Sequence, residues 1–193
     1  MRLNDKEIQA LLDTRPHTIQ PMPPKEAISG VTVDVTLANS FTVMESHSVD
    51  VIDLSAEKED LEEVFKKLSS SPKTLKEGER LYIHPGELVL GCLEEVIDIP
   101  DDMVGWLDGR SSLARLGLFT HVTANRIDPG FPGQVVLEFY NGGKIPLALK
   151  PGMKIGAISF EKLSGSCDKP YRLRSDAKYK DQRGAVSSRL TKD

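Results

Sequence analysis

Residues 80–107 read RLYIHPGELVLGCLEEVIDIPDDMVGWL, and this stretch decides the class of fold that we expect. Short apolar runs alternate here with turn residues, of which His84-Pro85-Gly86 and Pro100 are the clearest. The pattern predicts four short strands, at Arg80–Ile83, Leu88–Leu93, Val96–Ile99 and Val104–Leu107.

The same pattern continues on both sides of this stretch. An earlier strand is predicted at Val31–Leu37, where Val and Leu alternate with Thr and Asp, and later ones at Leu118–Thr123, Gln134–Tyr140, Ile145–Leu149 and Lys154–Phe160. Turns are expected between the later strands at Asn141-Gly142-Gly143 and Lys150-Pro151-Gly152. Many short strands spaced by roughly 8–12 residues favour a mainly β protein, a sandwich or jelly roll.

Few helices are expected beside these strands. Asn4 and Glu7 fit a capping box, and Ile8, Leu11 and Leu12 share one helical face, which predicts a helix ending near Thr14. A second amphipathic helix is predicted within Glu57–Ser70, as an excursion on the surface of the sheet protein. The last thirty residues have little apolar periodicity and are interpreted as a tail or lid.

Composition excludes several classes of function. The net charge is −4, and it is uneven: residues 50–102 carry 6 basic and 15 acidic side chains, whereas residues 103–160 carry 6 and 3. Such a chain is a poor nucleic-acid binder, because duplex affinity needs many phosphate contacts at once, but it can bind a small anion. No charge-free stretch approaches the ~20 residues of a membrane helix. The charged N-terminus and two distant cysteines, Cys92 and Cys167, favour the cytoplasm.

The densest chemical pattern is Asp108-Gly109-Arg110-Ser111-Ser112-Leu113-Ala114-Arg115-Leu116-Gly117. One or two helical turns closing at Gly117 would combine N–H groups, two hydroxyls and arginine forks, as in a phosphate cradle. A capped surface helix with solvated arginines explains the same spacing.

A second pattern, residues 124–133, reads ANRIDPGFPG. Its prolines and glycines fix a stiff loop that presents Arg126 and Asp128. The aspartate of such a loop can accept a sugar hydroxyl, bind a hydrated metal or merely cap a turn.

Glu138 is the third candidate. Alternation places Val136 and Glu138 on one face of their strand, and Val135, Leu137 and Phe139 on the other. A lone carboxylate in so apolar a strand must be paired, exposed to solvent or shifted in pKa for proton transfer.

Zinc chemistry and serine hydrolysis have no motif here. The histidines at positions 17, 47, 84 and 121 show no metal-ligand spacing, and neither cysteine has a Pro-Cys-x-x-Cys partner. No G-x-S-x-G elbow surrounds Ser111 or Ser112. We therefore expect no catalytic zinc and no Ser-His-Asp triad.

Taken together, the motifs resemble the dCTP deaminase family of the dUTPase-like superfamily. The resemblance is carried by DGRSSLARLG (108–117), HVTA (121–124), RIDPG (126–130) and VLEFYN (136–141), and it continues through Tyr171, Ala177-Lys178-Tyr179 and Gln182. It implies one domain over residues 1–193, a distorted jelly-roll or dUTPase-like β-barrel with residues 161–193 as a lid. It also implies a homotrimer with active sites at subunit interfaces, and Mg²⁺ carried by the nucleotide triphosphate.

The activity that this resemblance implies is hydrolysis of dCTP to dUTP and ammonia, for thymidylate synthesis, without zinc. Glu138 would be the general base and acid on water, with Ser111, Arg115 and the Ala124 carbonyl near that water. Asp128 would contact the sugar, and the backbones of Val136 and Leu137 the base. The resemblance also assigns nucleotide contacts to Arg126, to the closing lid residues Tyr171, Lys178 and Gln182, and to the loop Arg110, Ser111, Ser112, Leu113, Ala114 and Arg115.

Alternatives remain open at this point. A dUTPase would use Asp128 to activate water, but it would leave Glu138 without a role, and the tail lacks the glycine-rich closing motif. A bifunctional deaminase and dUTPase, or a non-catalytic nucleotide-binding module, also fits the cradle. The family suggests dTTP as a possible feedback inhibitor. Its members often have His where this chain has Asn125, which puts one local contact in doubt.

Overall fold

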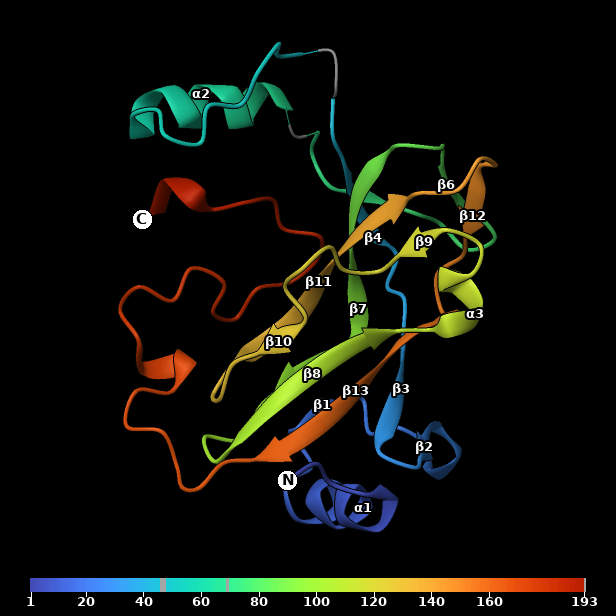
Figure 1. The fold of residues 1–193 in the computed structure, drawn as a ribbon, viewed down its shortest axis with the longest axis vertical. Helices are drawn as coiled ribbons and strands as arrows, with labels where there is room; N and C mark the ends of the chain where they lie inside the picture. Colours follow the sequence, from blue (N-terminus) through green and yellow to red (C-terminus); the bar gives the residue numbers. More distant parts are fainter. Residues whose placement is uncertain (46–47, 69, 193) are drawn as a thin grey trace.

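The computed structural model describes residues 1–45, 48–68 and 70–192, and these form a mainly β body (Figure 1). The first sheet has the strand order β5 (Lys73–Thr74), β4 (Ser40–Val43), β7 (Leu88–Asp98), β11 (Pro132–Asn141) and β9 (Leu118–Phe119), with β1 (Ile19–Gln20) paired to β7. The second has the order β10 (Arg126–Ile127), β8 (Met103–Gly109), β13 (Lys154–Lys162), β3 (Thr32–Thr36) and β2 (Ile28–Ser29). A small third ladder joins β12 (Leu147–Leu149) to β6 (Leu81–Ile83).

The core contains side chains from both large sheets. Among the largest fully buried side chains are Phe41 and Phe139 of the first sheet and Phe160 of the second. Because strand side chains alternate between faces, Leu137 and Phe139 of β11 enter this core while Glu138 between them turns to the opposite face. The predicted mainly β class is confirmed.

The distorted jelly roll or barrel that we expected is present in an open form, as two large sheets. No continuous ladder closes the two sheets in the part of the chain that the structure describes. They meet instead where the chain passes from β3 to β4, through an isolated bridge between Leu37 and Leu93. Five- and six-stranded sheets joined at such a corner form a sandwich-like body.

Both predicted longer helices are confirmed. In α1 (Asp5–Thr14) the Asn4 side chain accepts from Glu7 N at 3.0 Å and the Glu7 carboxylate accepts from Asn4 N at 3.1 Å. The second helix, α2 (Lys58–Leu68), buries only Leu61 and lies apart from the sheets in Figure 1, as an excursion. Within the described residues, no helix has the length and apolar character needed to cross a bilayer.

Some strand predictions need correction. The two strands predicted at Leu88–Leu93 and Val96–Ile99 are one continuous strand, β7, which ends at Asp98, and the intervening Glu95 is buried and accepts from Thr36. The strand predicted at Leu118–Thr123 is only β9, and the chain then enters the loop that leads to β10. The short strands β4, β5 and β10 were not predicted, since two to four residues leave too little periodicity.

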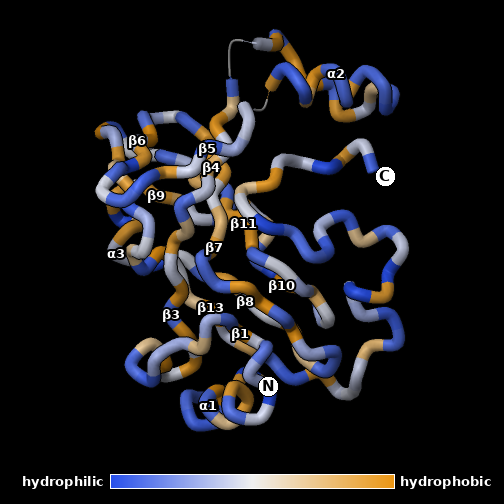
Figure 2. The backbone as a smooth tube through the Cα atoms, turned by 180° about the vertical axis from the view of Figure 1, so that it is seen from behind, coloured by the Kyte–Doolittle hydropathy of each residue, from blue (hydrophilic) through white to orange (hydrophobic). Residues whose placement is uncertain are grey.

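The C-terminal tail is mostly hydrophilic (Figure 2), yet it packs against the first sheet. Gln182 makes a parallel bridge to Gly133 of β11, and Ala185 is buried while its carbonyl accepts from Thr42 Oγ1 at 2.6 Å. Apart from 3₁₀ turns at Tyr171–Leu173 and Leu190–Lys192, this segment is irregular. Its attachment by backbone bonds explains why apolar periodicity did not reveal the packing.

Candidate active site

A cavity of about 540 Å³ lies between β11, the loop 124–131 and the C-terminal tail. Apolar side chains form much of its wall, including Leu88, Leu90, Leu107, Val135, Val136 and Phe131. Its polar groups come from three segments far apart in sequence: Asn125, Arg126 and Asp128 of the loop, Glu138 of β11, and Tyr171, Gln182, Ser187 and Ser188 of the tail. An apolar cavity with a few converging polar groups is the usual form of a small-molecule site.

Glu138 is the cavity group best suited to proton transfer. It lies directly opposite Leu90 in the β11–β7 ladder, so its carboxylate is held on an apolar surface. Burial raises the pKa of Glu138, while the Val122 N–H bond and the nearby His121 act in the opposite direction. The Val122 N–H donates to Oε2 at 3.4 Å, and it is the one hydrogen bond to this carboxylate from another described residue. A desolvated, sparsely bonded carboxylate with a raised pKa is suited to take a proton from water.

A register shift changes the predicted face of one neighbour. The β11–β7 pairing is interrupted between Gln134 and Val136, which breaks the strict alternation of side chains. Val135, predicted to point away from Glu138, therefore lines the cavity together with Val136.

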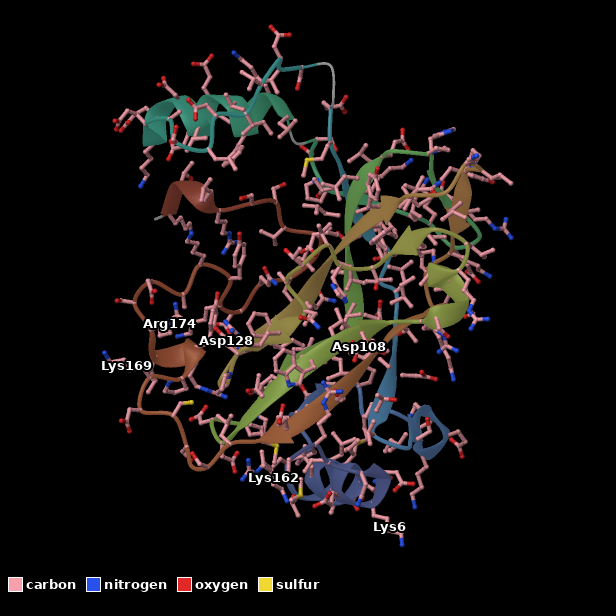
Figure 3. All side chains as sticks on the ribbon, in the orientation of Figure 1. Lys6, Asp108, Asp128, Lys162, Lys169 and Arg174 are labelled. Atoms are coloured by element: carbon pink, nitrogen blue, oxygen red, sulfur yellow. The ribbon has the colours of Figure 1, made fainter. Side chains whose placement is uncertain are left out.

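Asp128 is already paired in this structure. Its Oδ1 accepts from Arg126 Nε at 2.7 Å, and its Oδ2 lies 3.5 Å from Arg174 Nη1. Figure 3 shows Asp128 and Arg174 meeting where the loop faces the tail. The stiff loop thus presents Arg126 and Asp128 as an ion pair. In the sequence, Arg174 stands out only as one charged residue in a charge-rich part of the tail, and nothing there connects it to Asp128.

Two of the three predicted lid residues reach the cavity. The Tyr171 ring packs on Phe131 with centroids 5.4 Å apart, and its hydroxyl accepts from Tyr179 N at 2.9 Å. Gln182 Nε2 donates to Gln134 O at 2.8 Å, whereas its buried Oε1 has no hydrogen-bond partner among the described residues. Lys178 does not line the cavity; its carbonyl accepts a short hydrogen bond from the Arg189 guanidinium.

The predicted phosphate cradle lies elsewhere. Its hydroxyl residues begin α3 (Ser111–Ala114), and the turn closes at Gly117 in a left-handed conformation, as expected. None of residues 110–115 lines the cavity, and Figures 1 and 2 place α3 at the side of the sheets away from the tail. Arg110 Nη1 instead pairs with Asp34 Oδ1 at 2.9 Å.

One chain therefore assembles only part of the predicted site. The predicted residues brought together are Ala124, Arg126, Asp128, Val136, Glu138, Tyr171 and Gln182. Leu137 is 1% exposed in the core, so only its backbone is available to a ligand. Sequence analysis did not predict the apolar wall of the cavity, including Leu90 and Tyr179. Leu90 could have been assigned to it, because strand alternation places Leu90 on the same face as Leu88 and Cys92.

The described residues contain no cluster of three or more His, Cys, Asp or Glu side chains able to hold a metal ion. Of the histidines considered from the sequence, His47 lies outside the described residues.

Known proteins are similar to this chain over its whole length. A family model described as dCTP deaminase-like matches residues 2–163. A dCTP deaminase of Pectobacterium atrosepticum is 57% identical over 193 residues, which is 100% of both chains. A dCTP deaminase of Hamiltonella defensa subsp. Acyrthosiphon pisum is 56% identical over the same full length.

A solved structure shares the fold. The crystal structure of 2′-deoxycytidine 5′-triphosphate deaminase from Agrobacterium tumefaciens aligns with a TM-score of 0.61 and 18% identity, over 83% of this chain and 47% of that one. Because the family model spans most of the sequence and full-length relatives are more than half identical, this chain belongs to the dCTP deaminase-like family.

Proposed function

We propose that this protein hydrolyses dCTP to dUTP and ammonia, with Glu138 as general base and acid. One observation carries the proposal: in a chain of this family, the carboxylate of Glu138 is desolvated, sparsely bonded and directed to an apolar cavity of nucleotide size. The names of the full-length relatives support the substrate. The product would feed thymidylate synthesis in the cytoplasm.

The proposed chemistry uses one carboxylate twice. Water gives a proton to Glu138 as its oxygen adds to C4 of cytosine, and that proton passes to ring N3. The remaining hydroxyl proton then travels through the same carboxyl to the amino group, which leaves as ammonia while C4 becomes a carbonyl. The Ala124 carbonyl, at the cavity wall, would orient the water. Transfers of this kind contribute about 10²–10⁴-fold in rate.

The other cavity residues would bind the nucleotide. Asp128 is proposed to contact the sugar, the backbones of Val136 and Leu137 the base, and Tyr171, Lys178 and Gln182 the nucleotide as part of a lid formed by residues 161–193. The buried Oε1 of Gln182, which has no hydrogen-bond partner among the described residues, supports such a contact, since an unsatisfied buried acceptor costs free energy. The end product dTTP would compete for the same cavity.

The phosphate cradle would come from a second copy, in a homotrimer of single-domain chains. Arg110–Arg115 lie outside the cavity of their own chain, although a triphosphate needs cationic partners. Next to α3, the surface exposes Leu116, Phe119, Val122 and Tyr140, and Val122 also bonds Glu138. An apolar patch that adjoins both half-sites supports an interface there, with Ser111 and Arg115 of one copy reaching the water at Glu138 of another. Mg²⁺ would enter on the triphosphate, where it neutralises charge.

The deciding experiment measures ammonia and pyrophosphate in parallel from purified protein given dCTP and Mg²⁺. Ammonia without pyrophosphate is expected. Both products together would indicate the bifunctional enzyme, pyrophosphate from dUTP alone would indicate a dUTPase, and binding without either product would indicate a nucleotide-binding module. Repeating the assay after chelation and readdition of Mg²⁺ alone tests the zinc-free expectation.

A further inference from the structure

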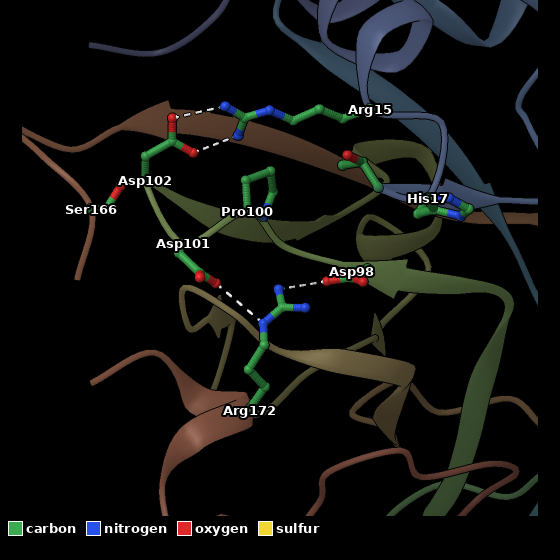
Figure 4. Close-up of a pocket in the computed structure, with 9 residues that line it drawn as sticks. Arg15, His17, Asp98, Pro100, Asp101, Asp102, Ser166 and Arg172 are labelled. Atoms are coloured by element: carbon green, nitrogen blue, oxygen red, sulfur yellow. Dashed lines mark hydrogen bonds and ion pairs between the residues drawn. The ribbon is translucent and has the colours of Figure 1, made fainter. Parts of the chain in front are cut away.

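A second cavity, of about 410 Å³, lies between the segment that follows α1, the turn between β7 and β8, and the tail (Figure 4). Its charged side chains form two separate ion-paired groups. On one side Arg15 Nη1 pairs with Asp102 Oδ1 at 2.6 Å; on the other, Arg172 is held between Asp98 and Asp101. Only the second group includes a residue of the tail that covers the nucleotide cavity, namely Arg172.

We propose that Arg172 is a positioning residue, which fixes the tail, and Tyr171 with it, against the loop 128–131 of the nucleotide site. Arg172 itself is not among the residues lining that site. The inference rests on the proposed function and adds to it a residue that acts through others.

The Arg172 guanidinium clamps two elements at once. Its Nη2 donates to Asp98 Oδ1 at 2.8 Å and to the Ile99 carbonyl at 3.1 Å, and its Nε donates to Asp101 Oδ1 at 3.2 Å. Asp98 ends β7, whereas Asp101 belongs to the turn before β8. A planar fork with several fixed donors suits such a junction, and a lysine can satisfy only part of it.

The backbone beside Arg172 is bonded to the loop. Tyr171 N donates to Pro129 O at 2.8 Å and Arg172 N donates to Gly130 O at 3.1 Å. Gly130 adopts a φ of +75°, and a Cβ there would lie 2.6 Å from Pro170 Cβ and 2.9 Å from Asp101 Oδ1. Since Gly130 N also donates to Ile99 O at 2.9 Å, the loop is held between the tail and the end of β7.

This arrangement gives Arg172 an effect on the site one residue away. The Tyr171 ring is fixed on Phe131 and its hydroxyl on Tyr179 N, so both tyrosines line the nucleotide cavity from the clamped segment. Releasing the clamp would increase the population of chains whose tail has left the loop. Apparent substrate affinity falls in proportion to the competent fraction, whereas chemistry at Glu138 is unchanged once the tail has closed.

The clamp is not expected to control global folding. The Arg172 side chain is 33% exposed and its carboxylate partners are 32% and 43% exposed, and ion pairs of this kind contribute little to stability. Arg172 variants should therefore fold. Arg15 offers a matched control, because it is an arginine of the same cavity whose carboxylate partner is Asp102.

The test compares Arg172→Gln, Arg172→Lys and Arg15→Gln with the parent enzyme in steady-state kinetics. For Arg172→Gln we expect KM for dCTP to rise about three- to tenfold with kcat within about twofold, and Arg172→Lys should recover part of the loss. Arg15→Gln should leave both constants unchanged. Equal kinetics of parent and Arg172→Gln, or an equal rise in KM for Arg15→Gln, would overturn the proposal.

A second measurement needs no activity. Hydrogen exchange of peptides covering residues 168–182 should be faster in Arg172→Gln than in the parent, with the exchange of β13 unchanged. If the parent itself releases no ammonia, the proposed function fails while this exchange arm still tests the clamp. Unchanged exchange at residues 168–182 would refute the clamp whatever the kinetics.

Discussion

Glu95 of β7 is buried and Glu138 of the neighbouring strand β11 is half-buried, and burial raises the pKa of both carboxylates. They differ in their partners. Glu95 accepts from Thr36 N at 3.0 Å and from Thr36 Oγ1 at 2.8 Å, whereas Glu138 accepts only the 3.4 Å bond from Val122 among the described residues. Glu138 lines the nucleotide cavity, whereas Glu95 lines neither that cavity nor the one that contains Arg172.

A raised pKa alone therefore does not identify a catalytic carboxylate. Glu95 joins the corner where the two sheets meet, and its bonds leave its oxygens little capacity for a ligand. Glu138 has free acceptor positions beside an apolar wall. The partners of a buried carboxylate, more than the direction of its pKa shift, therefore indicate whether it serves the structure or the reaction.

The largest difference between the two residues is expected when each charge is removed without changing the size of the side chain. Glu138→Gln should lower kcat by about 10²–10⁴-fold, because an amide cannot accept the water proton, while dCTP still binds. Glu95→Gln should keep turnover within about tenfold. Ammonia release gives the rates and calorimetric titration with dCTP gives the binding. Turnover of Glu138→Gln within tenfold of the parent would end its proposed role.

A mixing experiment asks whether Glu138 also needs a second chain. Glu138→Gln and Arg115→Ala should each be inactive alone, and co-refolding equal amounts should restore about a quarter of the parent activity. Random assembly pairs an intact Glu138 with an intact Arg115 at one interface in four. Ammonia release measures the recovery. If the mixture is as inactive as each variant alone, Glu138 and Arg115 either belong to the same chain's site or do not act in one site.

The two residues should rank in the opposite order when the free energy of unfolding, rather than turnover, is measured. Glu95→Ala should lower the free energy of unfolding by about 1–3 kcal/mol, because it leaves the part-buried N–H and hydroxyl of Thr36 without their acceptor. Glu138→Ala should cost much less, since it removes a desolvated charge with one long bond. Urea unfolding followed by circular dichroism provides the comparison. Equal losses for the two variants would mean that their partners do not distinguish them.

A smaller effect is expected on how the free energy of unfolding depends on pH. The folded pKa of Glu138 lies above its ordinary value of 4.5, so the folded state holds this proton more tightly than the unfolded state. The resulting stabilisation is fully present below that ordinary value and is lost as pH rises through the folded pKa. Glu138→Gln should thus be more stable than the parent at neutral pH, and the gap should close in acid. The converse trend in urea midpoints would contradict the raised pKa.

Activity should respond to the same group in the opposite direction. General-base function needs the ionised carboxylate, so kcat/KM should fall as pH decreases through the raised pKa of Glu138. A pH–rate profile of the parent, with Arg15→Gln as a control that leaves the site intact, measures this limb. A profile that stays flat down to the range of an ordinary glutamate would argue against desolvation at position 138.

Sequence alone determined the features that depend on near neighbours in the chain. The Asn4–Glu7 capping box, the turn closing at Gly117, and the opposite faces of Leu137 and Glu138 follow from backbone geometry over a few residues. Family motifs, read in order, pointed to the nucleotide and to Glu138. These predictions needed no knowledge of what lies across the sheet.

Which of those groups come into contact depends on the packing of the whole chain. This packing set Glu95 of β7 against Thr36, paired Asp128 with Arg174, and placed Arg172 at the end of β7. In the folded chain, residues 110–115 lie outside the cavity that Glu138 lines. Each of these contacts joins segments whose packing is set by the whole core or by charges brought close on folding, so no local pattern in the chain encodes it.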